Sequence, residues 1–440
     1  MASRIQEKKH LSFNSLRKSL SQHINASTDS RKSSASQYAH HDVVMSGFAC
    51  MYFQDPSLVQ FQQRLETSRG RNNLQTLFNV HQTPKESQMR EILDNLSSES
   101  FAPVFKDFHE KLRRHLHLKE YEILPNIIMC VIDGVQHYSS KSISCKCCLH
   151  KTHKNGDKTY YHSVLQGAIM HPDKRQVLPV MPEAIKNGDG KEKQDCEINA
   201  AKRFVNRLYK AHPRQKFILG GDSLMSRQPL IEDVLNKNMH YLFVAKPTDH
   251  VYMYEWLEAF PELPTTEYVD EKGKTHRFYW QNNVPLNGGA DAIKVNYLEY
   301  QQIDESGKVT FKNSWVTDIE ITDKNIIKLA KAGRCRWKIE NECFNTLKNQ
   351  GYNINHNYGH GKENLSFNVY LLILLAFYFH QIFELTDGAY QVCRKRNGSK
   401  RYMWEQLRSI ITFAVFETWN ELLAVVTDPD EFESSIIKKS

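Results

Sequence analysis

The most constraining feature of this sequence is a continuous apolar run, residues 127–132, that ends in Asp133 and Gly134. Because the run is apolar at every position, it is typical of a strand buried on both faces of a sheet. A carboxylate at the end of such a strand costs free energy unless it is paired or binds a cation. Ligands also tend to lie at the carboxyl ends of sheet strands. We therefore expect Asp133 to belong to a functional site.

A second acid follows a second predicted strand. Residues 216–221 form an apolar stretch that ends in two glycines, and Asp222 comes directly after them. The glycines leave the backbone space for a ligand nearby. Predicted helices at 195–212 and 229–238 alternate with further predicted strands, so the sequence indicates an α/β fold.

A third acid, Glu340, lies in a segment, 333–348, that is predicted to form one helix with Trp337, Phe344 and Leu347 facing inward. Arg336 precedes this acid by one turn, and Lys348 follows it by two. Taken alone, the segment suggests a surface ion pair between Arg336 and Glu340, worth a few tenths of a kcal/mol. Together with the two acids upstream, it suggests a site for a metal ion and a phosphate.

The residue composition and the spacing of apolar residues change several times along the chain, and these changes predict six regions. The N-terminus is polar and basic, short helical patterns follow, and a stretch dense in aromatic residues interrupts the alternation of strands and helices. The regions are a polar basic arm (1–45) with a short helix near 11–24, a helical DNA-binding region (46–125), the first part of the core (126–246), a β-rich insertion (247–312), the second part of the core (313–385) and a C-terminal helical region (386–440).

The net charge of +8 permits nucleic-acid binding without requiring it. Lys85 and Arg90 are predicted on the outer face of a helix in the 46–125 region. Such short helices with basic faces suit a helix-turn-helix kind of DNA-binding head, and equally a plain helical subdomain. The amphipathic stretch 401–426 suits either pairing of subunits or core packing.

The nine cysteines are scattered, and the N-terminus lacks an apolar targeting segment. These features predict reduced thiols in a soluble, cytoplasmic protein. The most apolar run, 369–379, is too short to span a bilayer and predicts a buried core helix.

Cysteine and histidine gather in residues 145–162. Cys145 and Cys148 have C-x-x-C spacing, and His150 or His153 could complete a tetrahedral zinc site. No second C-x-x-C pair exists, so the alternative is a loop with free thiols. His137 and His162 are expected to line a cleft or the core.

Three local sequences together resemble the catalytic boxes of bacterial insertion-sequence DDE transposases, which belong to the RNase H-like superfamily. They are residues 131–140 (Val-Ile-Asp-Gly-Val-Gln-His-Tyr-Ser-Ser), 220–224 (Gly-Gly-Asp-Ser-Leu) and 336–341 (Arg-Trp-Lys-Ile-Glu-Asn). The most similar group carries a Tyr-Arg-Glu-Lys signature around the last acid. This chain departs from that signature in having Gly333 at the Tyr position, and seven residues instead of six between Glu340 and Lys348.

The resemblance implies an RNase H-like core interrupted by a β-rich insertion, with an N-terminal helical DNA-binding region and C-terminal helices. It implies that Asp133, Asp222 and Glu340 are catalytic and hold two Mg²⁺ ions, for which Mn²⁺ can substitute. It further implies a homodimer on double-stranded DNA at the nucleoid, acting on terminal inverted repeats and target DNA. The residues expected to contact DNA are Arg336, Lys348, Arg334, Lys246, Arg90 and Lys85.

Two other functions stay open at this point. One is a catalytically impaired, transposase-derived DNA-binding protein, which the departures at Gly333 and Lys348 would suit. The other is a different RNase H-like nuclease.

Overall fold

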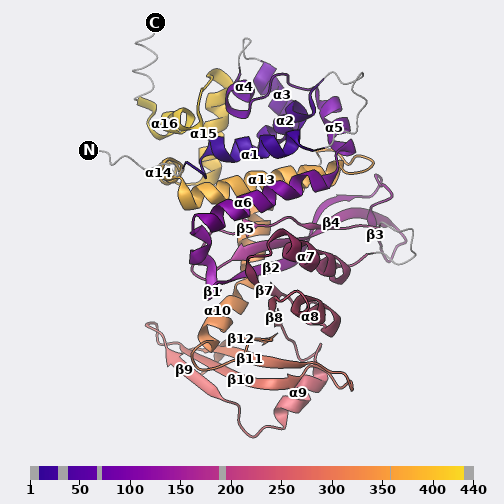
Figure 1. The fold of residues 1–440 in the computed structure, drawn as a ribbon, viewed down its shortest axis with the longest axis vertical. Helices are drawn as coiled ribbons and strands as arrows, with labels where there is room; N and C mark the ends of the chain where they lie inside the picture. The colour runs from indigo at the N-terminus through magenta and orange to yellow at the C-terminus, as the bar shows by residue number, and fades with distance from the viewer. Residues whose placement is uncertain (1–8, 28–37, 67–71, 188–194, 357, 431–440) are drawn as a thin grey trace.

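The computed structural model describes residues 9–27, 38–66, 72–187, 195–356 and 358–430. It has an α/β fold built on one mixed sheet of 12 strands, as the sequence predicts at this level. Helices from both ends of the chain gather at one end of the molecule, and a β-meander forms the other (Figure 1).

The centre of the sheet consists of three parallel strands. They are β2 (Ile127–Ser140), β7 (Lys216–Gly221) and β8 (His240–Val244), paired in that order. Parallel neighbours need crossover connections, and α7 (Glu197–Ala211) and α8 (Gln228–Leu235) provide the helical parts of them.

The other side of β2 is antiparallel. It pairs with β4 (Lys158–Met170), whose far edge pairs with the short strands β3 (Leu149–Thr152), β5 (Leu178–Pro179) and β6 (Glu183–Ile185). Strand β1 (Glu122–Leu124) adds a short pairing at the start of β2.

The predicted β-rich insertion extends this same sheet. After α9 (Val251–Glu258) come four antiparallel strands, and the last of them pairs with β8 through Trp315 to Thr317. That strand also crosses the predicted boundary at residue 312. The four strands are β9 (Thr265–Val269), β10 (Thr275–Pro285), β11 (Lys294–Ile303) and β12 (Val309–Thr317).

The helical end of the molecule is organised around α13 (Leu365–Thr386). By length and composition this helix could cross a membrane, but 89% of its most apolar 18-residue window is buried inside the fold. It is therefore a core helix, as predicted, and its burial is consistent with a soluble protein. The helices of this layer are α1 (Phe13–Asn25), α2 (His40–Tyr52), α3 (Leu58–Glu66), α4 (Asn73–Phe78), α5 (Glu86–Asn95), α6 (Ala102–Arg114), α14 (Gly388–Arg396), α15 (Lys400–Phe413) and α16 (Trp419–Thr427).

Both ends of the chain enter one aromatic cluster in this layer. The ring of Tyr52 lies 5.3 to 5.6 Å from the rings of Phe13, Phe78, Trp404 and Trp419. In the predicted polar arm, the short helix expected near 11–24 is present as α1, and it packs into the core by burying Phe13 and three aliphatic side chains. Residues 1–8 and 28–37 of that arm lie outside the described residues. The amphipathic helix predicted at 401–426 is instead two helices, α15 and α16, which bury Trp404, Leu407 and Trp419 in the core; pairing of subunits stays a prediction.

Gly333 is required by the close approach of a helix to the sheet. A Cβ atom at this position would lie 2.6 Å from Cε2 of Trp315 on β12, which is fully buried. The helix α10 (Ile326–Arg334) can therefore rest on the indole ring only if residue 333 has no side chain.

We predict that Gly333→Ala lowers the free energy of unfolding by roughly 1–3 kcal/mol because of this overlap. In an unconstrained helix the same change would raise the free energy of unfolding by up to ~1 kcal/mol. A decrease would therefore indicate the overlap with Trp315, and an increase would indicate that it is absent. Urea unfolding would measure the effect. Trp315→Phe removes the nearest ring atoms, so the double variant should lose less than the sum of the two single variants. Strict additivity would contradict the proposed contact.

Candidate active site

Asp133 and Asp222 occupy equivalent positions along the directions of two neighbouring parallel strands. Val131 on β2 pairs with Gly220 on the parallel strand β7, and each acid lies two residues farther along its own strand direction. Asp133 is inside the long strand β2, whereas Asp222 is the first residue after β7. The Asp222 carboxylate accepts a hydrogen bond of 3.0 Å from the backbone N–H of Leu224, which fixes the turn that follows.

Glu340 reaches these acids from an irregular helix. The predicted continuous helix is instead α10, a short α11 (Arg336–Lys338), a π-helical turn (Ile339–Phe344) and α12 (Asn345–Asn349). The π-helical turn packs against β2. Single π turns in α-helices are frequent at functional sites.

The raised pKa of Asp133 indicates that the carboxylates of Asp222 and Glu340 lie near it. The pKa of Asp133 is raised to about 7, first by burial and then by the negative charges of Glu340 and Asp222, while Arg336 and the Gly134 N–H oppose the rise. One cation therefore faces three carboxylates, and the cluster carries negative charge that its own side chains do not balance.

A fourth carboxylate, Glu197, also faces this cluster. A Cβ atom at Gly134 would lie 2.2 Å from Oε1 of Glu197, and burial together with the charge of Asp222 raises the pKa of Glu197. Sequence reasoning missed it because Glu197 is the first residue of α7, where acids are common for helix stability alone.

Arg336 pairs with Asp133 and not with Glu340. Its Nη1 lies 3.3 Å from Oδ2 of Asp133, and its side chain stays 35% exposed. The i, i+4 surface ion pair suggested by the isolated segment is thus replaced by a contact within the acid cluster. The exposed part of the guanidinium remains available to a phosphate.

The π turn changes which side chains share a helix face. The Asn345 N–H bonds to the carbonyl of Glu340, five residues back, so the turn holds one extra residue. In a regular helix Lys348 would lie about 80° from Glu340; with the extra residue the angle falls to about 20°. The same shift turns Trp337 away from Phe344. The prediction that Trp337 faces inward is wrong, since it is 47% exposed.

Lys338 anchors this helix to the sheet. Its buried Nζ donates hydrogen bonds of 2.6 to 2.8 Å to the carbonyls of His171, Pro172 and Lys174, in the turn after β4. A buried ammonium group is tolerated only with such partners. Because Lys338 lies two residues before Glu340, this contact positions the third acid.

Within the described part of the chain, the structure gives no contact with the acid cluster for four of the other residues predicted to bind DNA. The Arg334 guanidinium stacks on Tyr300 and Phe311, 5.3 and 4.8 Å from the ring centroids, and so joins α10 to the β-meander. Arg90 forms an ion pair with Glu86. Lys85 and Lys246 are exposed. Of the six residues, Arg336 contacts the acid cluster and Lys348 shares the helix face of Glu340.

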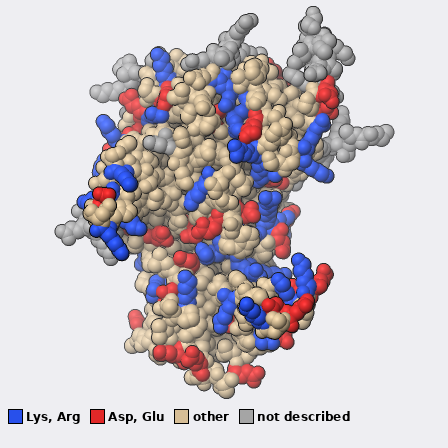
Figure 2. Space-filling model, turned by 180° about the vertical axis from the view of Figure 1, so that it is seen from behind, with Lys and Arg blue, Asp and Glu red and all other residues tan. Residues whose placement is uncertain are grey.

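On the face drawn in Figure 2, basic side chains do not form one continuous surface. In Figure 2 they gather where the β-meander meets the upper part of the molecule, with acids interspersed. This pattern agrees with 58 Lys and Arg residues against 50 Asp and Glu residues in the whole chain. Any contact with DNA must therefore depend on local groups more than on overall charge.

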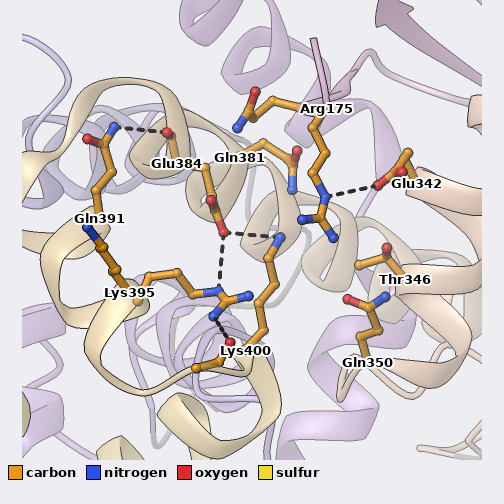
Figure 3. Close-up of a pocket in the computed structure, with 12 residues that line it drawn as sticks. Arg175, Glu342, Thr346, Gln350, Gln381, Glu384, Gln391, Lys395 and Lys400 are labelled. Carbon is orange, nitrogen blue, oxygen red and sulfur yellow. Dashed lines mark hydrogen bonds and ion pairs between the residues drawn. The ribbon is translucent and has the colours of Figure 1, made fainter.

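A pocket of about 340 Å³ lies beside Glu342, two residues after Glu340 in the chain (Figure 3). Glu342 lines it, and residues two apart on a helix do not face each other. Its charges are largely paired: Arg175 with Glu342 at 3.7 Å, and Lys400 with Glu384 at 3.1 Å. It is distinct from the acid cluster.

The predicted zinc ligands are brought together only in part. Cys145 and Cys148 lie close to each other, but their neighbours are His162 and His360. His153 instead bonds to Thr159 at 2.8 Å, and the ring of His150 faces Tyr160. The sequence could not offer His360 as a partner, because it lies 212 residues beyond Cys148. All nine cysteines are free thiols.

No protein-family model matches the chain, and no curated protein matches it either. The three acids offer carboxylate oxygens, which are the kind of ligand that Mg²⁺ prefers, but they are not among the groups of described side chains whose ligand atoms all lie within 4.8 Å of one another. The raised pKa of Asp133 marks the unbalanced charge that a divalent ion would neutralise.

We predict that the contribution of the Asp133 carboxyl to the stability of the metal-free protein falls as pH rises from about 4 to about 7, measured as the difference between the wild type and Asp133→Asn. In this window folded Asp133, with its pKa near 7, keeps a proton that the unfolded chain releases. Asp133→Asn should remove this dependence and raise the free energy of unfolding at pH 8 in chelator by roughly 1–3 kcal/mol. Denaturation at several pH values would measure it, with Asp323→Asn as control. An unchanged pH profile in Asp133→Asn would refute this account of the cluster.

We also predict that Lys338→Met lowers the free energy of unfolding by roughly 2–4 kcal/mol, because three carbonyls lose their donor. Lys331→Met, at an exposed position on the preceding helix, should change it by less than about 0.5 kcal/mol. Equal effects of the two changes would show that Lys338 is no anchor.

Proposed function

We propose that this chain is a DNA transposase of the insertion-sequence DDE kind, which cuts an element at its terminal repeats and joins the 3′-OH ends to target DNA. The observation that carries the proposal is the approach of Asp222 and Glu340, from two other elements, to Asp133, whose pKa is raised first by burial and then by the negative charges of these two acids.

The strand order supports an RNase H-like core. If β2, β4 and the short β5–β6 edge are its first three strands, β7 is the fourth and β8 the fifth, in the spatial order 3-2-1-4-5. The acids then follow the order of the DDE transposases that the chain resembles: on the first strand, just after the fourth, and on a helix beyond the insertion.

In this proposal each residue of the site has its own role in phosphodiester cleavage. Asp133, Asp222 and Glu340 would hold two Mg²⁺ ions, which supply an activated nucleophile and neutralise the leaving oxygen. Arg336 would bind a phosphate oxygen with the exposed part of its guanidinium, and Lys348, on the face of Glu340, would bind the neighbouring phosphate. Lys338 keeps the helix in place. Two chains acting as a homodimer would cut the two ends of one element.

Cleavage of the DNA that flanks the gene for this chain tests the proposal. We expect Mg²⁺- or Mn²⁺-dependent nicking and joined products, and a loss of at least about a thousandfold in rate for Asp133→Ala, Asp222→Ala or Glu340→Ala. Asp323→Ala, which changes an exposed acid outside the cluster, should retain full activity.

The two other functions give different results in the same assay. Specific binding without cleavage would indicate a catalytically impaired DNA-binding protein. Cleavage without joined products would indicate another RNase H-like nuclease. Undiminished cleavage by Asp133→Ala would overturn the assignment of the site.

A further inference from the structure

Four sulfur and nitrogen atoms converge at the edge of the sheet, away from the acid cluster. They are Sγ of Cys145 and Cys148, before and at the start of the β3–β4 hairpin, and Nε2 of His162 on β4 and of His360 before α13. Three separate stretches of chain contribute. All four atoms lie within 4.8 Å of one another.

The distances between these atoms match a tetrahedral zinc site. The two sulfurs are 3.8 Å apart. Three sulfur–nitrogen distances are 3.7, 3.5 and 3.3 Å, and the two nitrogens are 3.1 Å apart. Zinc bonds of about 2.3 Å to sulfur and about 2.0–2.1 Å to nitrogen predict about 3.8 Å, about 3.5 Å and about 3.3 Å for these three kinds of pair.

The surroundings orient the ligands as zinc requires. Nδ1 of His360 lies 2.7 Å from the carbonyl oxygen of Gly361. A proton on Nδ1 satisfies that carbonyl and leaves the lone pair of Nε2 directed at the cluster, the usual arrangement of a metal-bound histidine. The Cys145 N–H lies 3.4 Å from Sγ of Cys148 and donates toward it, which favours a thiolate.

We propose that Cys145, Cys148, His162 and His360 bind one structural Zn²⁺ ion. Four protein ligands complete the coordination shell, so no position is left for catalysis. The ion would join the β3–β4 hairpin to the segment that leads from the helix carrying Glu340 to α13. It is a second metal site, with ligand chemistry different from that of the acid cluster.

The position of His360 shows what the ion would stabilise. Gly359 and Gly361, on either side of it, have φ of 126° and 71°, which other residues rarely adopt. On the far side, the Asp94 carboxylate caps the start of α13 by accepting from the N–H groups of residues 362–365 at 2.7 to 2.9 Å. Zinc and Asp94 would thus fix this short segment from two directions.

Metal analysis of the purified full chain tests the proposal. We expect about one zinc per chain, and after cobalt substitution the intense visible bands of tetrahedral cobalt with a thiolate charge-transfer band. Cys148→Ser and His360→Asn should lose the zinc and these bands. Cys147→Ser and His150→Asn are matched controls, from the same stretch as the proposed ligands, and should retain both.

Three results would overturn the proposal: folded wild-type protein without zinc, a Cys145–Cys148 disulfide in its place, or zinc loss in Cys147→Ser or His150→Asn equal to that in the ligand variants. Because wild-type metal content is measured first, the test does not depend on variants that fold poorly. It also requires no DNA cleavage, so its failure and that of the proposed function are separate. Hydrogen exchange adds a readout: zinc removal should speed exchange in residues 358–364.

Discussion

The carboxylate of Asp133 is the group on which the arrangement of this molecule depends. It is placed in a buried strand, next to Asp222 across a parallel pairing, and opposite Glu340 on a helix that packs against the same strand. Burial and like charge both favour its protonated form, and Arg336 is the cation that opposes them. A fold that gathered these acids without a ligand would sacrifice stability, which supports the proposed binding of a cation at this cluster.

Holding Glu340 against this repulsion requires anchors on both sides of it. Before it, the buried ammonium group of Lys338 is bonded to three carbonyls of the turn after β4. After it, the chain runs through the Gly359–Gly361 segment to α13, whose first turn is capped by Asp94. The proposed zinc ion would add a third anchor at His360. Lys338 joins the acid-bearing helix directly to the turn after β4, whereas Asp94 and the proposed zinc ion would fix the chain that follows this helix.

The sequence predicts the α/β fold, the strands that carry Asp133 and Asp222, and the buried helix α13, because each depends on a local pattern of apolar residues. It could not predict that α1 is buried, since its apolar side chains are spaced among many polar ones. The contacts of Lys338 and His360 could not be predicted either, because their partners lie more than 150 residues away in the sequence. Glu197 could not be recognised from a single sequence, because an acid in the first turn of a helix is common for the stability of the helix alone.

The two departures from the Tyr-Arg-Glu-Lys signature have structural explanations of different kinds. The additional residue between Glu340 and Lys348 is absorbed by the π turn, which returns Lys348 to the face of Glu340. The missing Tyr is not restored in this way: the space in front of residue 333 is filled by Trp315 from β12, and a side chain there would overlap the indole ring. The space next to residue 333 is therefore filled by the indole ring of Trp315, which comes from strand β12 of the sheet. Arg334, one residue later, stacks on two further aromatic rings of the same meander. The inserted strands thus hold the start of the helix that carries Glu340, so the β-meander acts as part of the framework of the proposed active site.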